Sequence, residues 1–260
     1  MRTQAAVEIK VNEQFDHLPG APIVEAVIDV RADTIDAFEE PHVRSQLEDK
    51  LDGYEFLDSQ RAFRHEVKLE AGKPSQAVSD LGWKGLRFQS TDRKHIVQFN
   101  RDGFVFSRLE PYQSWKRFYD EGLCLWRTYI KLAQPVEIYR LGLRYINRLQ
   151  LNPGEVHFED YLQPAAMPPR NMDLPFLGFM HYDTLAVPGH PYAINVVRTI
   201  QRPADNSLTG IGVILDIDVF TTHSIEFNET LLPERLQEMR WLKNKVFFGS
   251  VTEKALESLR

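Results

Sequence analysis

Cysteine is almost missing from this 260-residue sequence, in which Cys124 is the single example. One cysteine excludes an internal disulfide and a cluster of thiolate metal ligands, and it suits a reducing compartment. Long apolar runs are missing too: no segment approaches the roughly 18 apolar residues that cross a bilayer, and the first 20 residues contain no apolar core of signal-peptide length. We therefore expect a cytoplasmic protein that is neither exported nor inserted into a membrane.

The common sequence signatures of catalysis are missing as well. The chain has no G-x-S-x-G, no Walker A motif and no G-x-G-x-x-G, which removes most support for α/β-hydrolase, P-loop and Rossmann enzymes. Its eight histidines are scattered without H-E-x-x-H or a comparable spacing of metal ligands. We expect no cofactor, and the sequence favours a protein without catalytic activity.

The chain also lacks an excess of positive charge. The chain has 37 acidic and 31 basic residues, for a net charge of −6, so its overall electrostatics disfavour nucleic acid as a partner. With 43% hydrophobic and 26% charged residues, the composition is that of an ordinary folded protein. We expect residues 1–260 to form a single domain.

Alternating apolar residues predict many short strands, and helical spacing predicts a few helices between them. The sequence therefore predicts an α+β fold with an extensive antiparallel sheet covered by helices. Each half contains several strands and ends in a helix, so residues 21–135 and 136–260 are candidate related halves, although no convincing residue identity links them. The expected strands are 23–31, 62–70, 85–90, 95–99, 104–109, 139–151, 176–187, 192–201 and 212–220, and the expected helices lie within 36–53, 111–133, 233–248 and 251–259.

Local signals place the ends of some of these elements. The segment Asn100–Gly103 predicts a hairpin turn between two of the strands. Pro111 is expected in the first turn of the 111–133 helix. Ser250 and Glu253 have the spacing of a capping box that starts the last helix.

Five segments have a distinctive combination of residues: "APIVEAVIDVR", "LEPYQSWKRFYDE", "RLGLRYINRL", "DIDVFTTHSIEF" and "FFGSVTEKAL". Taken together they resemble a sporadically distributed bacterial family of uncharacterised proteins of about this length. The resemblance runs from about Ala21 to the C-terminus. It implies a shared architecture and a patchy distribution of the kind seen in mobile or defence-associated genes, and it implies no reaction.

The segment 139–151, "YRLGLRYINRLQL", carries three arginines on one face if it is a strand. Side chains alternate along a strand, so Arg140, Arg144 and Arg148 share a face on which Gly142 leaves an open notch. Arg140 and Arg144 are then roughly 13 Å apart along the strand, and their guanidinium groups could converge on a phosphate or carboxylate. The other interpretation, which we prefer, is that these arginines pair with carboxylates of a neighbouring strand.

Two carboxylates suited to that role share the polar face of the strand 212–220. Asp216 and Asp218 lie two residues apart, and neighbouring carboxylates repel one another unless a cation lies between them. If the cation is arginine, the group is structural. If it is a divalent metal, the pair is similar to the metal-binding strand of polymerases and nucleotide cyclases, and the protein would be a metal-dependent enzyme acting on nucleotides or nucleic acid.

The 111–133 helix has a broad aromatic stripe with two interpretations. Its aromatic residues, which include Tyr112 and Trp115, either fill the core or line a ligand cavity between the helix and a curved sheet. Core packing is the commoner reason for such a stripe. Asn147, on the apolar face of the arginine strand, is a candidate hydrogen-bond partner for buried tyrosine or tryptophan groups. We expect Cys124 on this helix to be a small buried packing residue.

The leading hypothesis is therefore a non-catalytic recognition or regulatory protein that binds a protein partner or a small anionic ligand. The candidate ligand-binding residues are Arg140, Arg144, Asn147, Tyr112 and Trp115. The alternative is the metal-dependent enzyme, with Asp216 and Asp218 as metal ligands.

Overall fold

A computed structural model gives the fold of the chain and describes residues 5–35, 40–70, 73–151, 157–167, 169, 171, 174, 178–201 and 211–260. The side chains of Pro41, 65–70 and 73–76 are not part of this description. Phe38, expected to pack ahead of the first helix, lies outside the described residues.

The centre of the fold is one ten-stranded sheet, in the order β2-β3-β4-β5-β1-β6-β9-β8-β7, with the short β10 beside β6. Every neighbouring pair in it is antiparallel. The predicted α+β fold with an extensive antiparallel sheet is confirmed. The strands are β1 (Ile23–Thr34), β2 (Tyr54–Glu70), β3 (Lys73–Ser90), β4 (His95–Asn100), β5 (Gly103–Leu109), β6 (Pro135–Gln150), β7 (Met180–Ala186), β8 (Tyr192–Gln201), β9 (Gly212–Thr221) and β10 (Ile225–Glu226).

The two halves of the chain use the same connectivity in this sheet. In the first half, β1 pairs with the last strand, β5, and β4, β3 and β2 follow outwards. In the second half, β6 pairs with β9, and β8 and β7 follow outwards. The halves meet where β1 and β6 pair antiparallel, for example Ile28 opposite Leu143. A common ancestry of residues 21–135 and 136–260 stays a prediction, and the sheet is continuous across both.

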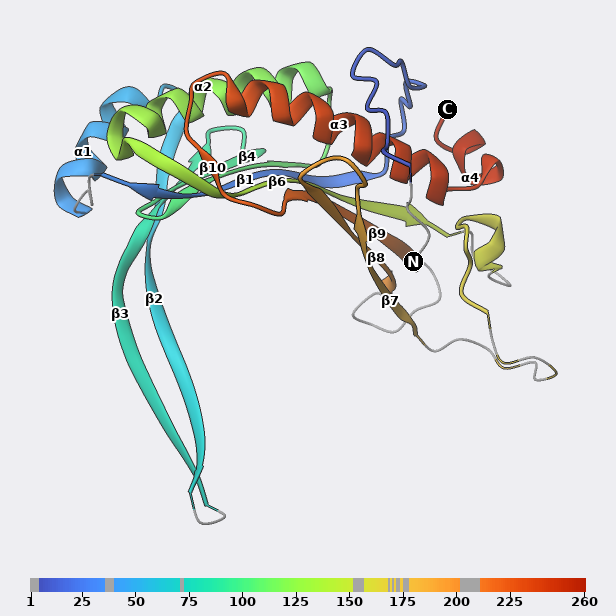
Figure 1. Cartoon of the computed structure of the whole chain (residues 1–260), viewed down its shortest axis with the longest axis horizontal. Helices are drawn as coiled ribbons and strands as arrows, with labels where there is room; N and C mark the ends of the chain where they lie inside the picture. The colour runs from blue at the N-terminus through green and yellow to red at the C-terminus, as the bar shows by residue number, and fades with distance from the viewer. Residues whose placement is uncertain are drawn as a thin grey trace.

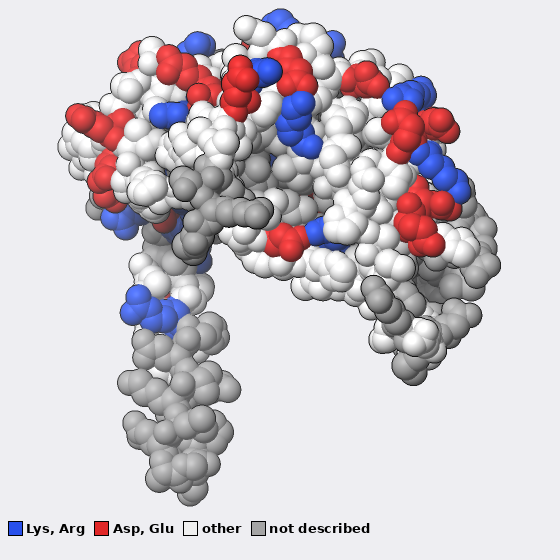
Figure 2. All heavy atoms as spheres, turned by 45° about the vertical axis from the view of Figure 1, so that its right-hand side comes forward, with Lys and Arg blue, Asp and Glu red and all other residues white. Residues whose placement is uncertain are grey.

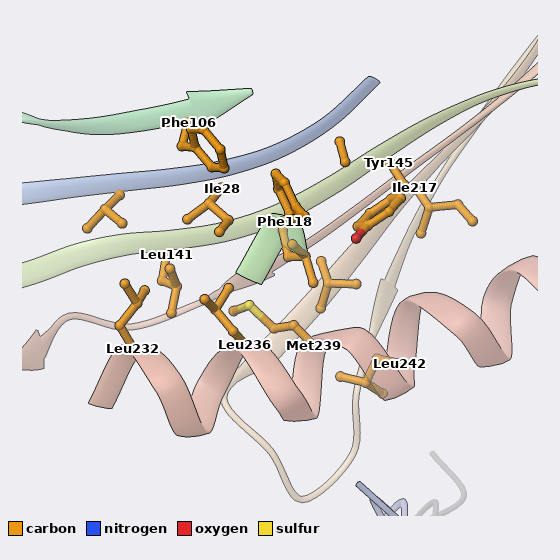
Figure 3. Packing of buried hydrophobic residues seen from close by; sticks show 14 of the residues in the cluster. Ile28, Phe106, Phe118, Leu141, Tyr145, Ile217, Leu232, Leu236, Met239 and Leu242 are labelled. Carbon is orange, nitrogen blue, oxygen red and sulfur yellow. The ribbon is translucent and has the colours of Figure 1, made fainter. Parts of the chain in front are cut away.

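The helices cover one face of the sheet (Figure 1). They are α1 (Glu40–Lys50), α2 (Trp115–Ala133), α3 (Leu231–Ser250) and the short α4 (Glu253–Glu257), together with a 3₁₀ turn, η1 (Phe158–Asp160). In the close view, Leu236 and Met239 of α3 lie between the helix and the strands that carry Tyr145 and Ile217, and Leu242 lies further along the helix (Figure 3). All five side chains are buried, so the hydrophobic effect fixes the position of α3 over the second half of the sheet.

Helix α2 approaches the first half of the sheet closely because of a glycine. A Cβ on Gly122 would lie 2.8 Å from the Ile28 side chain and 3.1 Å from that of Phe106. Phe118, one turn earlier, stacks on Phe106 with ring centroids 5.3 Å apart. At Phe118 the aromatic stripe therefore forms core, as one of the two interpretations expected.

The strands β2 and β3 continue beyond the sheet as a two-stranded arm (Figure 1). β3 pairs with β4 only over 85–89, whereas it pairs with β2 along its length, from Ser90 opposite Tyr54 to Lys73 opposite Glu70. Phe63, Val78 and Leu81 expose about half or more of their surface on this arm, at 55%, 59% and 52%.

Several local predictions can be checked against the element ends. The hairpin at Asn100–Gly103 is confirmed, with Asn100 opposite Gly103 in the register. Pro111 is not in the first helical turn: α2 begins at Trp115, and the Ser114 hydroxyl caps it by accepting from the Arg117 N–H at 3.3 Å. The capping box at Ser250 is also wrong, because α3 continues through that residue and Thr252 caps α4 instead.

Within the described residues, no helix is both long enough and apolar enough to cross a membrane.

Candidate functional site

Arg140 and Arg144 of β6 form an arginine strip on the face of the sheet opposite the helices, and both charges are paired. Arg140 donates from Nη1 to Asp29 at 2.5 Å and from Nη2 to Asp218 at 2.9 Å. Arg144 donates through two nitrogens to Asp216, at 2.8 and 2.5 Å. The predicted approach of these arginines to Asp216 and Asp218 across the sheet is confirmed.

Gly142 does not leave an open notch between the arginines. A Cβ there would lie 2.5 Å from Arg140 Nη1, so the guanidinium of Arg140 already folds over this glycine. The absence of a side chain is what allows Arg140 to reach both Asp29 and Asp218. The space predicted for an anion is therefore filled by the arginine itself.

Asp216 and Asp218 face these arginines from β9. Burial raises the pKa of the Asp218 carboxyl, and the nearby Arg140 guanidinium opposes that rise. In the described part of the chain, no group of three or more His, Cys, Asp and Glu side chains is arranged to hold a metal ion. The two candidate metal ligands are thus engaged in ion pairs.

A different region contains a cleft with a volume of about 740 Å³. It lies between the start of α2, the second half of α3, the strand β6 and the N-terminal segment 15–23. Tyr112, Trp115 and Asn147, which the sequence singled out, all line it. At the start of α2, the aromatic residues therefore line a cavity between the helix and the sheet, which was the second interpretation of the aromatic stripe.

Aromatic groups form the inner wall of this cleft. The Tyr112 and Tyr145 hydroxyl oxygens are 3.0 Å apart, and their rings meet edge to face with centroids at 5.7 Å. Burial raises the pKa of Tyr112 to about 12 and that of Tyr145 well above its usual range, so both hydroxyls keep their protons at neutral pH. Phe15 and Phe248 stack across the other side of the cleft at 5.6 Å.

Asn147 anchors the floor of the cleft. Its side chain is 2% exposed, and its amide donates to the Leu215 carbonyl of the neighbouring strand at 2.9 Å. The expected bond to a tyrosine hydroxyl or a tryptophan N–H is not among its hydrogen bonds in the described structure, and the Tyr112 and Tyr145 hydroxyls pair with each other.

Two cations of α3 border the cleft without a carboxylate partner among the described residues. Arg240 and Lys243 lie one turn apart, so they share a face of the helix. The Lys243 ammonium lies 4.0 Å from the centroid of the Tyr145 ring, and the Arg240 guanidinium lies 5.5 Å from the Trp115 ring. Burial, with Arg240 nearby, lowers the pKa of Lys243 to about 7.

The other charges around the cleft do not compensate these two cations. Asp16 borders it, but its carboxylate accepts from Arg260 at 3.0 Å. Lys116 also borders it and pairs with Asp120 at 2.5 Å. The backbone N–H groups in the first turn of α2 lie nearby, and a helix N-terminus carries partial positive charge. The cleft is therefore electropositive, in a chain whose net charge is −6.

Arg240 and Lys243 were not among the residues predicted to bind a ligand. A signal was present: the segment Glu238–Phe248 has two basic residues at i, i+3 spacing beside large apolar residues. This spacing indicates one helix face, but it does not show that the face meets Trp115 and Tyr145, which come from other elements.

Other candidates are less developed. A smaller cleft of about 420 Å³ borders His95 and Arg108, where the Arg108 guanidinium donates to the Pro111 carbonyl at 2.9 Å. Cys124 is exposed, so the prediction that it is a buried packing residue is wrong. Acidic and basic side chains are interspersed on the face shown in Figure 2, without the single-sign surface that nucleic acid would favour.

Comparisons of the chain with protein-family models, with curated proteins and with solved structures found no match. The resemblance to a sporadic bacterial family stays a prediction.

Proposed function

We propose that the protein is a non-catalytic cytoplasmic recognition protein that binds a small anionic ligand in the cleft between α2, α3, β6 and segment 15–23. The observation that carries the proposal is the presence of two cations, Arg240 and Lys243, that border an aromatic cleft and have no carboxylate partner in the described part of the chain. A partly buried cation without a partner is costly. A bound anion would remove that cost.

The aromatic side chains of the cleft indicate the kind of group that the ligand carries beside its negative charge. Tyr112, Trp115 and Phe248 offer flat apolar surface, and binding sites of this kind bury the apolar body of a ligand while a few polar groups orient it. A volume of about 740 Å³ suits a ligand with one aromatic or branched apolar group. We therefore propose a small organic acid or phosphate ester with an apolar body.

Calorimetric titration with phenyllactate and phenyl phosphate tests this proposal, with benzyl alcohol as the uncharged comparison. We expect both anions to bind and the alcohol to bind at least tenfold more weakly. Arg240→Gln removes a charge-assisted contact worth about 1.5–3 kcal/mol, which corresponds to a roughly 10- to 100-fold loss of affinity. The matched control is Lys131→Gln, on the exposed side of α2. Equal binding of the anions and the alcohol would contradict the proposal.

A protein partner is the second candidate, and the arm favours it. Phe63, Val78 and Leu81 are exposed there, and Met180 and Tyr182 are exposed on β7, at the other edge of the same sheet. Exposed apolar surfaces mark protein interfaces. Because the two surfaces lie at opposite edges, two copies of the chain could exchange the same contact twice around a two-fold axis.

The metal-dependent enzyme has less support. Asp216 and Asp218 each accept from an arginine, and a metal would have to displace both guanidinium groups. The resemblance to a patchily distributed family leads us to expect the gene in a mobile or defence-associated locus, where neighbouring genes would indicate the pathway of the ligand.

A further inference from the structure

Lys243 combines two features: it borders the cleft, and its ammonium packs on an aromatic ring without a carboxylate partner among the described residues. It lies on the cleft face of α3 with its ammonium over the Tyr145 ring at 4.0 Å. Lys116, Lys245 and Lys254, by contrast, each form an ion pair with a carboxylate, at 2.5, 2.5 and 2.6 Å. The amine of Lys243 is thus presented to the cleft and not to a neighbouring acid.

We propose that the ligand carries a carbonyl group beside its acid, as an α-keto acid with an apolar side chain does, and that Lys243 Nζ holds it as a reversible imine. This inference rests on the proposed function, because it assigns a ligand class to the same cleft. Arg240 would bind the carboxylate. The aromatic wall of Trp115 and Tyr112 would take the apolar side chain.

The chemistry needs no further reactant. The lone pair of Nζ forms a bond to the carbonyl carbon, the C=O π electrons move to oxygen, and a proton passes from nitrogen to that oxygen to give a carbinolamine. Loss of water then leaves the C=N bond. Nothing is oxidised or reduced, and water reverses the reaction. The paired hydroxyls of Tyr112 and Tyr145 line the same wall and stay protonated, so they can donate hydrogen bonds to the departing oxygen.

Attack requires a neutral amine, and the surroundings of Lys243 favour one. Burial and the nearby Arg240 lower its pKa to about 7, whereas an ordinary lysine titrates near about 10.4. A substantial fraction of Lys243 is therefore neutral at pH 7, when exposed lysines are almost fully protonated. The titratable and charged groups that border the cleft with it are Arg240 from α3, Lys116 at the start of α2, Asp16 and His17 from the N-terminal segment, Tyr145 from β6 and Tyr112 from the loop before α2.

Reductive trapping with a matched pair of probes tests the inference. Phenylpyruvate carries the ketone, and phenyllactate is the same molecule with a hydroxyl in its place. With phenylpyruvate and cyanoborohydride, we expect one adduct with the mass of the probe less one oxygen atom, located at Lys243 by peptide mass spectrometry. Phenyllactate should compete with it. Trapping at Lys243 relative to the exposed lysines should be high up to about pH 7 and should fall as the pH rises towards 10, where ordinary lysines also lose their protons.

Two variants keep the experiment informative. Lys243→Arg keeps a cation in the cleft but cannot form an imine, so it should bind phenyllactate and give no adduct. Lys131→Met removes an exposed lysine of α2 and should leave the adduct at Lys243 unchanged.

The outcomes separate this inference from the proposed function. If both probes bind and no adduct forms at Lys243, the imine is wrong and the anion site stands. Adducts spread evenly over the lysines, without competition from phenyllactate, also overturn the imine. If neither probe binds, the imine and the anion site are both overturned.

Discussion

The ion pair between Arg144 and Asp216 provides the sharpest test of how the sheet is stabilised. In Asp216→Asn, the neutral amide can still accept one hydrogen bond, but the charge that faces Arg144 is lost. The Asp216 side chain is 12% exposed, whereas that of Arg144 is 48% exposed. Breaking a fully buried pair costs about 3–5 kcal/mol, and an exposed pair contributes about 0–1 kcal/mol.

Intermediate exposure places the expected cost between these limits. The freed guanidinium of Arg144 can regain water on its exposed side, so its desolvation is largely relieved, whereas Asp216 loses a two-point, charge-assisted contact. We expect Asp216→Asn to lower the free energy of unfolding by about 1–2 kcal/mol, or the Tm by roughly 2–8 °C.

Urea unfolding followed by circular dichroism measures this change. The matched control is Glu48→Gln, which neutralises a carboxylate on α1 whose pair with Arg44 is nearly half exposed on both sides, and we expect a loss of at most about 0.5 kcal/mol there. A double-mutant cycle with Arg144→Gln should give a coupling of about 1 kcal/mol. Equal losses in Asp216→Asn and Glu48→Gln, or a coupling near zero, would refute the assignment of the strip as a stabilising network.

Two further predictions follow from the other surfaces. Millimolar Mg²⁺ or Mn²⁺ should leave the Tm nearly unchanged, because Asp216 and Asp218 already pair with arginines. A metal that bound only the native state would raise the Tm, and a clear rise that disappears in Asp216→Asn would favour the metal-dependent enzyme. Light scattering during size-exclusion chromatography should show a dimer whose dissociation constant rises at least tenfold in Phe63→Ser combined with Val78→Ser, and a wild-type chain that stays monomeric at high micromolar concentration would contradict self-association through the arm.

Much of the sheet could be predicted because strand alternation is a local property. The paired faces of β6 and β9 follow from period-two patterns, and their opposite charges predicted which strands would be neighbours. The lengths of β2 and β3 were underestimated for the converse reason. The segments 54–61 and 73–84 lack a clear apolar alternation, so sequence alone indicated a strand only for 62–70 and 85–90 of β2 and β3. Pairing between the two strands, rather than burial of one face, defines these residues as strand.

The candidate site shows where local patterns stop being sufficient. Tyr112, Trp115 and Asn147 were identified, but their role depends on segment 15–23 and on the cleft face of α3, which come from opposite ends of the chain. Cys124 failed as a buried residue for a related reason. Its neighbours Leu123 and Leu125 are buried, yet Cys124 falls on the side of α2 that faces away from the sheet. Residues adjacent in sequence lie on different sides of a helix, so the burial of Leu123 and Leu125 does not predict that of Cys124.

The arginines of β6 and the cations of the cleft are in opposite situations, and the contrast supports the cleft as the proposed binding surface. On the open face of the sheet, strand register brings Asp218 and Asp29 to Arg140 and brings Asp216 to Arg144, so folding itself supplies each counter-charge. Around the cleft, the carboxylate of Asp16 turns to Arg260 and leaves Lys243 over an aromatic ring. Replacing Lys243 with a neutral residue of similar length would be expected to stabilise the free protein, since it removes a desolvated charge. A position at which the native side chain lowers stability is typical of a binding site, which supports the proposal that the ligand supplies the missing counter-charge.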